Sequence, residues 1–228
     1  MRKLFILSAF LSLNALAQES DTTMTLNPCE VVGVRSTKQQ PITETTICKD
    51  ELVRSYQGQD IPVLLQRTPS VLFYSDGGNY NGYMYYRLRG MDQTRINATL
   101  NGVPLNDPED QGAYFSNYPD FTANVGSVQI QRGVGTSTYG SASYAGSLNF
   151  EGPNLSDSAC HMFSVGGGSF NSKRFSLMEN TGIMKNGIAV YARYSNVSSD
   201  GYREHSGFRG ETFFLSVGKY GKNSLLKF

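Results

Sequence analysis

Apolar and polar residues alternate with a period of two along the last third of the chain. Four runs of strand length occur there, and several of them show this alternation: 161–168, 172–182, 187–197 and 209–220. One face of the third run consists of Ile188, Val190, Ala192 and Tyr194. Runs of about ten residues with this period indicate transmembrane β-strands, although a soluble antiparallel sheet has the same period.

The connections between these runs favour the membrane interpretation. The turns at 185–187 and 220–223 are short, whereas the segment 198–207 between them is long and polar. Short turns on one side of a sheet and long loops on the other are typical of outer-membrane proteins.

Residues 86–150 have a different pattern, in which short apolar strands alternate with turns that contain glycine. The Asn101–Gly102 pair is a strong signal for a tight turn between two strands. Two strand-like runs each end in an Arg-Gly pair, at Arg89–Gly90 and at Arg132–Gly133. This stretch therefore predicts a compact mixed domain built on short strands.

Two short helices are predicted ahead of these strands. The first starts at Lys49, with acidic residues in its first turn, where they favour the helix dipole. The second covers 60–67, with Asp60 as its N-cap and Pro62 in its first turn, where a missing amide costs little. A strand at 71–74 follows.

Two loops carry polar and aromatic side chains. The loop 76–82 has carbonyl and carboxylate groups, but it lacks the terminal bidentate acid of a calcium loop, so a plain turn is the better interpretation. The loop 106–120 has three acids without a visible catalytic partner, which favours a solvated loop over acid–base chemistry. Its exposed aromatics beside amides and acids suit recognition of a sugar or a metal chelate.

The N-terminus has the features of a cleaved export signal. Arg2 and Lys3 precede the apolar run 4–13, and Ala15–Leu16–Ala17 is a small-x-small cleavage site. Residues 1–17 are therefore predicted to be a signal peptide, and 18–40 a flexible polar leader. The leader has one β-prone island, formed by Glu30, Val31, Val32, Gly33 and Val34. Such an island is either an edge strand or a segment that adds to the sheet edge of another protein.

Composition narrows the class further. The net charge of +1 provides no basic field for nucleic acid, so no nucleic-acid partner is expected. Abundant glycine (24) and tyrosine (14) with 17% charged residues suit strands and turns better than helices. In an oxidising compartment Cys29 and Cys48 can form a disulfide, but unpaired thiols are an equally good interpretation of the three cysteines.

Catalytic and cofactor motifs are missing from the sequence. The two histidines, His161 and His205, lie far apart without clustered cysteines, which argues against a zinc site. No phosphate-binding glycine loop and no Gly-x-Ser-x-Gly nucleophile motif occurs. No catalytic residue, metal ligand or cofactor is therefore assigned, and the chain is not expected to be an enzyme.

Four ordered motifs resemble those of the TonB-dependent outer-membrane receptors. The segment 64–71, Leu-Leu-Gln-Arg-Thr-Pro-Ser-Val, resembles the family's Leu-Leu-x-x-x-Pro-Gly-Val, with Ser70 in place of glycine. Leu88–Arg89–Gly90 resembles its Ile-Arg-Gly, and 100–104 its Asp-Gly-Val-Pro turn. Residues 131–149 resemble the closing signature of its plug domain. The resemblance covers the chain from Glu30 to the end.

The resemblance implies an α+β plug domain of short strands and helices, followed by antiparallel β-strands of an incomplete transmembrane β-barrel. The family's barrel has 22 strands, which would require a longer chain than this one. The expected domains are the signal peptide 1–17, the leader 18–40 with the TonB box, the plug 41–153 and the first barrel strands 154–228. On this reading the chain is the N-terminal part of a receptor.

The implied function is energy-coupled uptake of a scarce nutrient, such as a ferric siderophore or another iron chelate, across the bacterial outer membrane. The expected partner is TonB with its inner-membrane energising complex, which would pair with the TonB box Glu30–Val34. The alternative is a truncated or stand-alone periplasmic plug-like protein that binds or scaffolds without transport.

The resemblance also suggests site residues. Plug loops reach the ligand at 76–83 and 110–117, which points to Tyr80, Gln111, Tyr114 and Phe115 as ligand contacts. Alternatively, these side chains only seal the plug against the barrel. Arg89 and Arg132 are expected to lock the plug to the barrel by pairing with glutamates of later strands. Without such partners they would be solvated surface residues.

Overall fold

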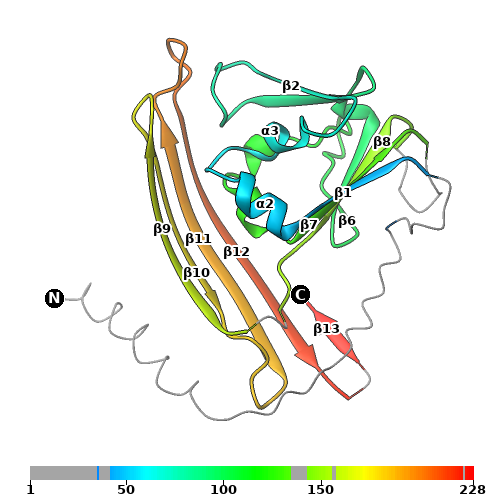
Figure 1. The fold of residues 1–228 in the computed structure, drawn as a ribbon, viewed down its shortest axis with the longest axis vertical. Coiled ribbons are helices and arrows are strands. Elements are labelled where there is room, and N and C mark those ends of the chain that lie inside the picture. The colour runs from blue at the N-terminus through cyan, green and yellow to red at the C-terminus, as the bar shows by residue number, and fades with distance from the viewer. Residues whose placement is uncertain (1–34, 36–41, 135–142, 156–157, 223) are drawn as a thin grey trace.

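The computed structural model describes residues 35, 42–134, 143–155, 158–222 and 224–228. Within these residues the chain forms two parts, a mixed α/β part and a curved sheet of long strands that stands beside it (Figure 1). We call residues 42–155 the mixed domain and the sheet formed by residues 158–228 the wall.

The central sheet of the mixed domain has the strand order β1-β7-β8-β5-β6. Its strands are β1 Glu44–Cys48, β5 Ile96–Leu100, β6 Val103–Pro104, β7 Ser127–Arg132 and β8 Gly146–Glu151. All pairings are antiparallel except that of β5 with β8, which is parallel. The predicted tight turn joins β5 to β6, and both Asn101 and Gly102 have the positive φ that such a turn requires.

Two short helices and a second sheet complete the mixed domain. The helices are α2 Lys49–Ser55 and α3 Ile61–Leu65, at the two places predicted. The second sheet consists of β2 Val71–Ser75, β3 Met84–Leu88 and β4 Met91–Asp92. Three short 3-10 helices are η2 Gln93–Arg95, η3 Phe115–Asn117 and η4 Phe121–Asn124.

The core of the mixed domain lies between the helices and one face of the central sheet. Its centre is an aromatic cluster whose ring centroids lie 5.1–5.7 Å apart, formed by Tyr86, Phe115, Phe121 and Phe150. Edge-on and tilted ring contacts at this spacing add to the hydrophobic effect of burying each ring. All five residues of α3 are buried, so this helix is held by tertiary packing rather than by its own length.

The wall is an antiparallel meander. Its strands are β9 Cys160–Gly168, β10 Ser172–Asn180, β11 Ile188–Ser199, β12 Phe208–Tyr220 and β13 Leu225–Lys227. The connections follow the predicted lengths only in part. The loop 200–207 between β11 and β12 is long and the turn 221–224 is short, but β10 and β11 are joined by the longer segment 181–187, and the short turn 169–171 lies at the same end as the long loop. The mixed α/β part followed by antiparallel strands confirms the predicted fold class.

The wall exposes a band of apolar side chains on its outer face, whereas its face toward the mixed domain combines buried polar side chains with a small apolar cluster that includes Met178, Ala189 and Tyr191. One outward row runs across four strands as Phe163, Leu177, Tyr194 and Phe213. These side chains are 38–68% exposed, whereas Ser176, Arg193 and Ser195 on the inner face are at most 6% exposed. This inverts the pattern of a soluble sheet and is the pattern of strands that face lipid. No helix in the described residues is long and apolar enough to span a membrane.

Asp60 does not cap α3 through its side chain as predicted. Asp60 occupies the N-cap position of α3, but its carboxylate makes no capping hydrogen bond, because it bonds to a neighbouring loop instead.

Cys48 and Cys160 are exposed and form no disulfide within the described residues. Cys29 and the predicted TonB box Glu30–Val34 lie outside the described residues, so the structure does not test either prediction.

Candidate functional site

The loop between β2 and β3, residues 76–83, is the first candidate for ligand contact, and we call it the apex loop. It is held from beneath by the residues that precede α3. The backbone amide of Gly82 donates to the Asp60 carboxylate at 3.0 Å, and the Asp60 amide donates to the carbonyl of Tyr80 at 2.9 Å. Asn81 donates through its side chain to the carbonyl of Gly58 at 2.7 Å. The loop is therefore ordered, while Tyr80 on it remains 62% exposed.

Asp60 is an unusual residue beneath this loop. Its side chain is buried, and this burial raises the pKa of the carboxyl group from 3.8 to about 7. Hydrogen bonds from Gly82 and Asn81 act in the opposite direction, because they favour the ionised form. The apex loop is thus bonded to a carboxyl group that titrates near neutral pH.

Tyrosines gather on the strands next to the apex loop. The rings of Tyr74 and Tyr85 stack with centroids 5.1 Å apart, and the guanidinium of Arg87 lies 5.6 Å above the Tyr74 ring. Partial burial and the neighbouring Asp76 carboxylate raise the pKa of the Tyr85 phenol. This sheet therefore offers aromatic rings and phenol groups beside the apex loop.

The second candidate loop, which contains Gln111 and Tyr114, is built around Asn106. The Asn106 side chain accepts from the amide of Ala98 at 2.8 Å and donates to the carbonyl of Gln111 at 2.7 Å. The Tyr114 phenol donates to the Asp110 carboxylate, and this bond lowers the pKa of Asp110 and raises that of Tyr114. The Tyr114 ring lies over Gly112, where an added Cβ would stand 2.8 Å from it.

Phe115 does not belong to this surface. It is 1% exposed and forms part of the aromatic core with Tyr86, Phe121 and Phe150, so the expectation that it contacts a ligand is wrong. Tyr114 is the extended N-cap residue of η3 and is half-buried, whereas Phe115 is the first residue of that 3-10 helix and is buried. Tyr114 therefore points outward while Phe115 points into the core.

Arg89 and Arg132, the two predicted lock residues, lie at one place in the structure. Arg89 is exposed and has φ 51, and its guanidinium covers Gly133, where an added Cβ would stand 2.7 Å from Nη1. Arg132 donates to Thr45 Oγ1 at 3.4 Å, and its Nε is buried without a hydrogen-bond partner in the described residues. The two Arg-Gly pairs thus meet, and within the described residues neither arginine pairs with a carboxylate.

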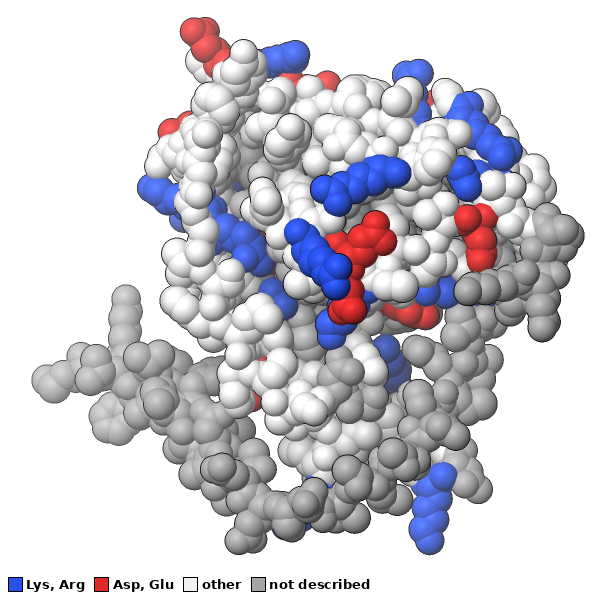
Figure 2. Space-filling model, viewed as in Figure 1, with Lys and Arg blue, Asp and Glu red and all other residues white. Residues whose placement is uncertain are grey.

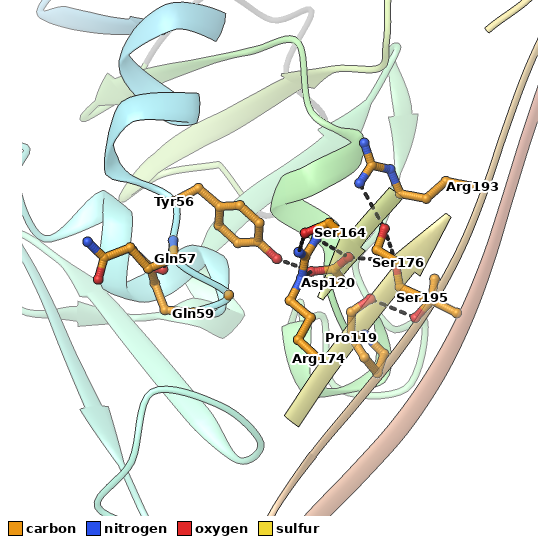
Figure 3. Close-up of polar contacts among 12 residues, drawn as sticks. Tyr56, Gln57, Gln59, Pro119, Asp120, Ser164, Arg174, Ser176, Arg193 and Ser195 are labelled. Atoms are coloured by element: carbon orange, nitrogen blue, oxygen red, sulfur yellow. Dashed lines mark hydrogen bonds and ion pairs between the residues drawn. The ribbon is translucent and has the colours of Figure 1, made fainter. Parts of the chain in front are cut away.

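The mixed domain is joined to the wall through a different charged pair, Asp120 and Arg174, which the sequence reasoning missed (Figure 3). Arg174 of β10 donates to the two Asp120 carboxylate oxygens, through Nε at 2.7 Å and through Nη2 at 2.9 Å. Its guanidinium also lies 5.2 Å from the centroid of the Tyr56 ring, and the Tyr56 phenol donates to the same carboxylate. The Asp120 side chain is fully buried, so the arginine compensates a charge that water does not reach.

A row of hydroxyl side chains on the wall receives this contact. Ser164, Ser176, Ser195 and Thr212 are register partners on four successive strands. Ser195 donates to the Asp120 carboxylate, and Thr212 donates to the carbonyl of Pro119 at 2.6 Å. Because these side chains are short, the segment that contains Asp120 can approach the backbone of the wall closely. We call Asp120, Arg174, Tyr56 and this hydroxyl row the docking contact.

The charges in the docking contact are reversed relative to the pairing expected for Arg89 and Arg132, in which the plug supplies the arginines and the barrel the glutamates. Here the mixed domain supplies the carboxylate and the wall supplies the arginine. A signal was present in the sequence, because Arg174 falls among the polar positions of a strand whose alternate positions are apolar. An arginine on the inner face of such a strand indicates a buried partner.

A second charged contact holds the N-terminal end of the described chain. Arg35 donates to Ser127 Oγ at 2.9 Å and to the carbonyl of Asn149 at 2.8 Å, and it pairs with Glu151 at 3.2 Å. Arg35 directly follows the predicted TonB box in sequence. The chain just after that segment is therefore bonded to the end of the central sheet.

The remaining charges do not form a single-sign surface. Figure 2 shows Lys and Arg side chains interspersed with Asp and Glu over the face around α2. A shallow hollow on this face is lined by Cys48, Asp50, Glu51, Arg54, Ser55 and Arg67. Among the described residues there is no group of three or more metal-ligating side chains.

The family comparison identifies the central part of the chain. Residues 36–147 match the family model described as the TonB-dependent Receptor Plug Domain. No curated protein shows significant sequence similarity to the chain.

Solved structures match both the mixed domain and the wall. The siderophore receptor PiuA from Acinetobacter baumannii matches with a TM-score of 0.61 at 19% identity, over 78% of this chain and 24% of that one. The unliganded ferric citrate transporter FecA matches with 0.63 at 20% identity, over 79% and 29%. The copper transporter OprC matches with 0.63 at 19% identity, over 81% and 30%. This chain thus spans between a quarter and a third of their lengths, and at these identities the likeness shows the fold.

Proposed function

Because residues 36–147 form a TonB-dependent receptor plug domain, we propose that this chain belongs to a receptor that takes up a scarce nutrient across the bacterial outer membrane with energy supplied through TonB. The receptors of this family are outer-membrane proteins and not enzymes. On this proposal residues 1–17 are the signal peptide, 18–40 the leader, 41–153 the plug and 154–228 the first strands of the barrel.

The observation that carries the proposal is the polarity of the wall. Its outer face exposes apolar rows such as the one through Phe163 and Phe213, whereas its inner face combines buried polar side chains with a small apolar cluster and binds the mixed domain at the docking contact. A soluble plug-like binding or scaffold protein would leave that apolar surface in water at a large free-energy cost. A sheet that faces lipid on one side and a plug on the other accounts for both faces.

We propose that the ligand is a metal chelate, most simply a ferric siderophore or another iron chelate. Matched structures include proteins described as a siderophore receptor, a ferric citrate transporter and a copper transporter, so the fold serves several metal-containing cargoes. On this chain Tyr80, Gln111 and Tyr114 would form the ligand-facing surface. Aromatic rings can pack against a chelate while the amide and phenol groups hydrogen-bond to its oxygen atoms.

We further propose that Glu30–Val34 is the TonB box and that TonB binds it by strand addition. Arg35 then marks the point at which a pulling force enters the mixed domain, because its guanidinium is bonded to β7 and β8. The bond between Arg35 and Glu151 would be among the first to break under such a force.

The test is accumulation of radiolabelled ferric citrate by cells that make the receptor, compared with cells that lack it. Uptake should require TonB, and Val32→Pro should abolish it, because proline removes an amide that strand addition needs. Binding of the chelate at the cell surface should remain, since the substitution lies outside the ligand surface. Uptake that persists without TonB would overturn the proposed coupling. If cells take up no ferric chelate although the receptor still binds TonB, the transported chelate would contain another metal.

A further inference from the structure

A loop of the wall lies against the apex loop of the mixed domain. This wall loop, residues 200–207, joins β11 to β12 at the end of the wall next to the apex loop (Figure 1). Arg203 donates through Nη1 to the carbonyl of Asp76 at 2.7 Å, and through its backbone amide to the carbonyl of Gly77 at 3.4 Å. The hydroxyl of Ser206 reaches the same Gly77 carbonyl at 3.3 Å. The wall loop thus bonds directly to the backbone of the apex loop.

Glycines of the apex loop allow this approach. An added Cβ on Gly78 would stand 3.0 Å from Cδ1 of the Tyr202 ring, and Gly78 has φ +68, which side-chain-bearing residues rarely adopt. On the same loop, a Cβ on Gly82 would stand 3.4 Å from the Phe208 ring. Two aromatic rings from the wall therefore pack on the apex loop at positions where it has no side chains of its own.

The wall loop is itself held in place by the tip of the neighbouring hairpin. Tyr202 makes an edge-on contact with Phe170, with centroids 5.4 Å apart, and the amide of Asp200 donates to the Phe170 carbonyl at 2.9 Å. Phe170 has φ 57, a conformation that a bulky residue adopts only when its surroundings enforce it. The contact between Phe170 and Tyr202 is thus maintained despite a strained backbone.

The apex loop is consequently held on two sides, by Asp60 from within the mixed domain and by the wall loop from outside. Tyr80 extends from it into solvent. We propose that the wall loop fixes the conformation in which the apex loop presents Tyr80, and that Tyr202 and Arg203 are positioning residues for this ligand surface. This inference rests on the proposed function, because Tyr80 needs a fixed position only if it contacts a ligand.

The experiment measures hydrogen exchange of the peptide that covers the apex loop, in the full protein in isolated membranes and without ligand. Its amides at Asp76 and Gly82 are protected by bonds to Tyr83 and Asp60. Tyr202→Ala and Arg203→Ala should each speed exchange of this peptide about fivefold, the effect of one hydrogen bond or comparable contact. Exchange in β7, in the central sheet, should not change. Tyr202→Phe keeps the ring on Gly78 and should behave as wild type, as should Glu204→Ala, an exposed change in the same loop.

The outcomes separate this inference from the function it rests on. Unchanged exchange of the apex loop in both alanine variants overturns the positioning role. Equal acceleration in β7 also overturns it, because the two residues would then only stabilise the whole domain. A Tyr202→Phe variant as fast as Tyr202→Ala would show that the ring contact is irrelevant. None of these results depends on which chelate is transported, so the proposed function can fail or hold independently.

Discussion

Removal of Arg174 should weaken the contact between the mixed domain and the wall. In the native protein this arginine donates to both oxygens of Asp120, whose side chain is fully buried, and covers the ring of Tyr56. Arg174→Ala leaves the carboxylate with hydroxyl donors from Tyr56 and Ser195 but without an opposite charge. Breaking a buried ion pair by removing one partner costs roughly 3–5 kcal/mol, mostly because the remaining charge stays buried.

A double-mutant cycle separates the pair from its surroundings. Asp120 has φ 59, a left-handed conformation that asparagine tolerates, so Asp120→Asn removes the charge without straining the backbone. The double variant Asp120→Asn/Arg174→Ala should be less damaged than the sum of the single variants, with a coupling free energy of about 1–3 kcal/mol. Arg209→Ala, at an exposed position of β12 in the same sheet, is the matched control and should stay within about 0.5 kcal/mol of wild type.

The assay is urea unfolding of the mixed domain in detergent-solubilised protein, followed by near-ultraviolet circular dichroism of its tyrosines, because the chain has no tryptophan. In Arg174→Ala the midpoint for the mixed domain should fall while the strand signal of the wall changes later. If Arg174→Ala unfolds like Arg209→Ala, the pair does not join the two parts and the reasoning from burial is refuted. Additive single variants would show that Asp120 and Arg174 act separately.

Three further predictions follow from the same structure. Between pH 3.8 and about 7, Asp60 holds a proton in the folded state that the unfolded state releases, so stability should fall as the pH rises through this window, by about 4 kcal/mol at most. Asp60→Asn should abolish this pH dependence of the free energy of unfolding, measured in urea. A variant with the same pH dependence as wild type would contradict the prediction. The double variant Tyr80→Ala/Tyr114→Ala should bind ferric citrate about tenfold more weakly while its membrane insertion stays normal. The matched control Tyr80→Phe/Tyr114→Phe should retain the ring contacts. Unchanged affinity in the alanine variant would show that both residues only seal the plug against the barrel. The double variant Arg89→Ala/Arg132→Ala should lower the urea midpoint of the mixed domain in the complete receptor, because glutamates of later strands are the expected partners of both arginines. A double variant that unfolds like wild type would show that both arginines are surface residues.

Local patterns were sufficient for much of the architecture. The alternation in 161–220 predicted the wall strands and which face of each is apolar, because side chains of a strand point to opposite faces in turn. The helices after Lys49 and Asp60 and the turn at Asn101–Gly102 also lie where capping and turn preferences placed them. Each of these features depends on residues within a few positions of each other, so the sequence contains the necessary information.

The candidate site was predicted less completely. Ligand contact by Tyr80 and Tyr114 stays a prediction, with Tyr80 exposed and Tyr114 half-buried in the structure. Phe115 was misassigned because an aromatic residue in a loop can serve either a core or a surface, and only its distance to Tyr86 and Phe150 decides. Asp60 was predicted to cap a helix, whereas its carboxylate bonds to Gly82, which the chain brings there from 22 positions away.

What the sequence determined by itself was therefore the long strands of the wall, the faces they present and the family of the plug. Only the tertiary structure decided which polar residues meet. Asp120 and Arg174 are 54 positions apart, and nothing in either neighbourhood specifies the other. Their pairing depends on the register of four wall strands, which aligns Ser164, Ser176, Ser195 and Thr212, and on the left-handed turn at Asp120. Whether two charged residues form a buried pair depends on their distance and on their desolvation in the complete fold. The sequence pattern around each residue specifies neither quantity.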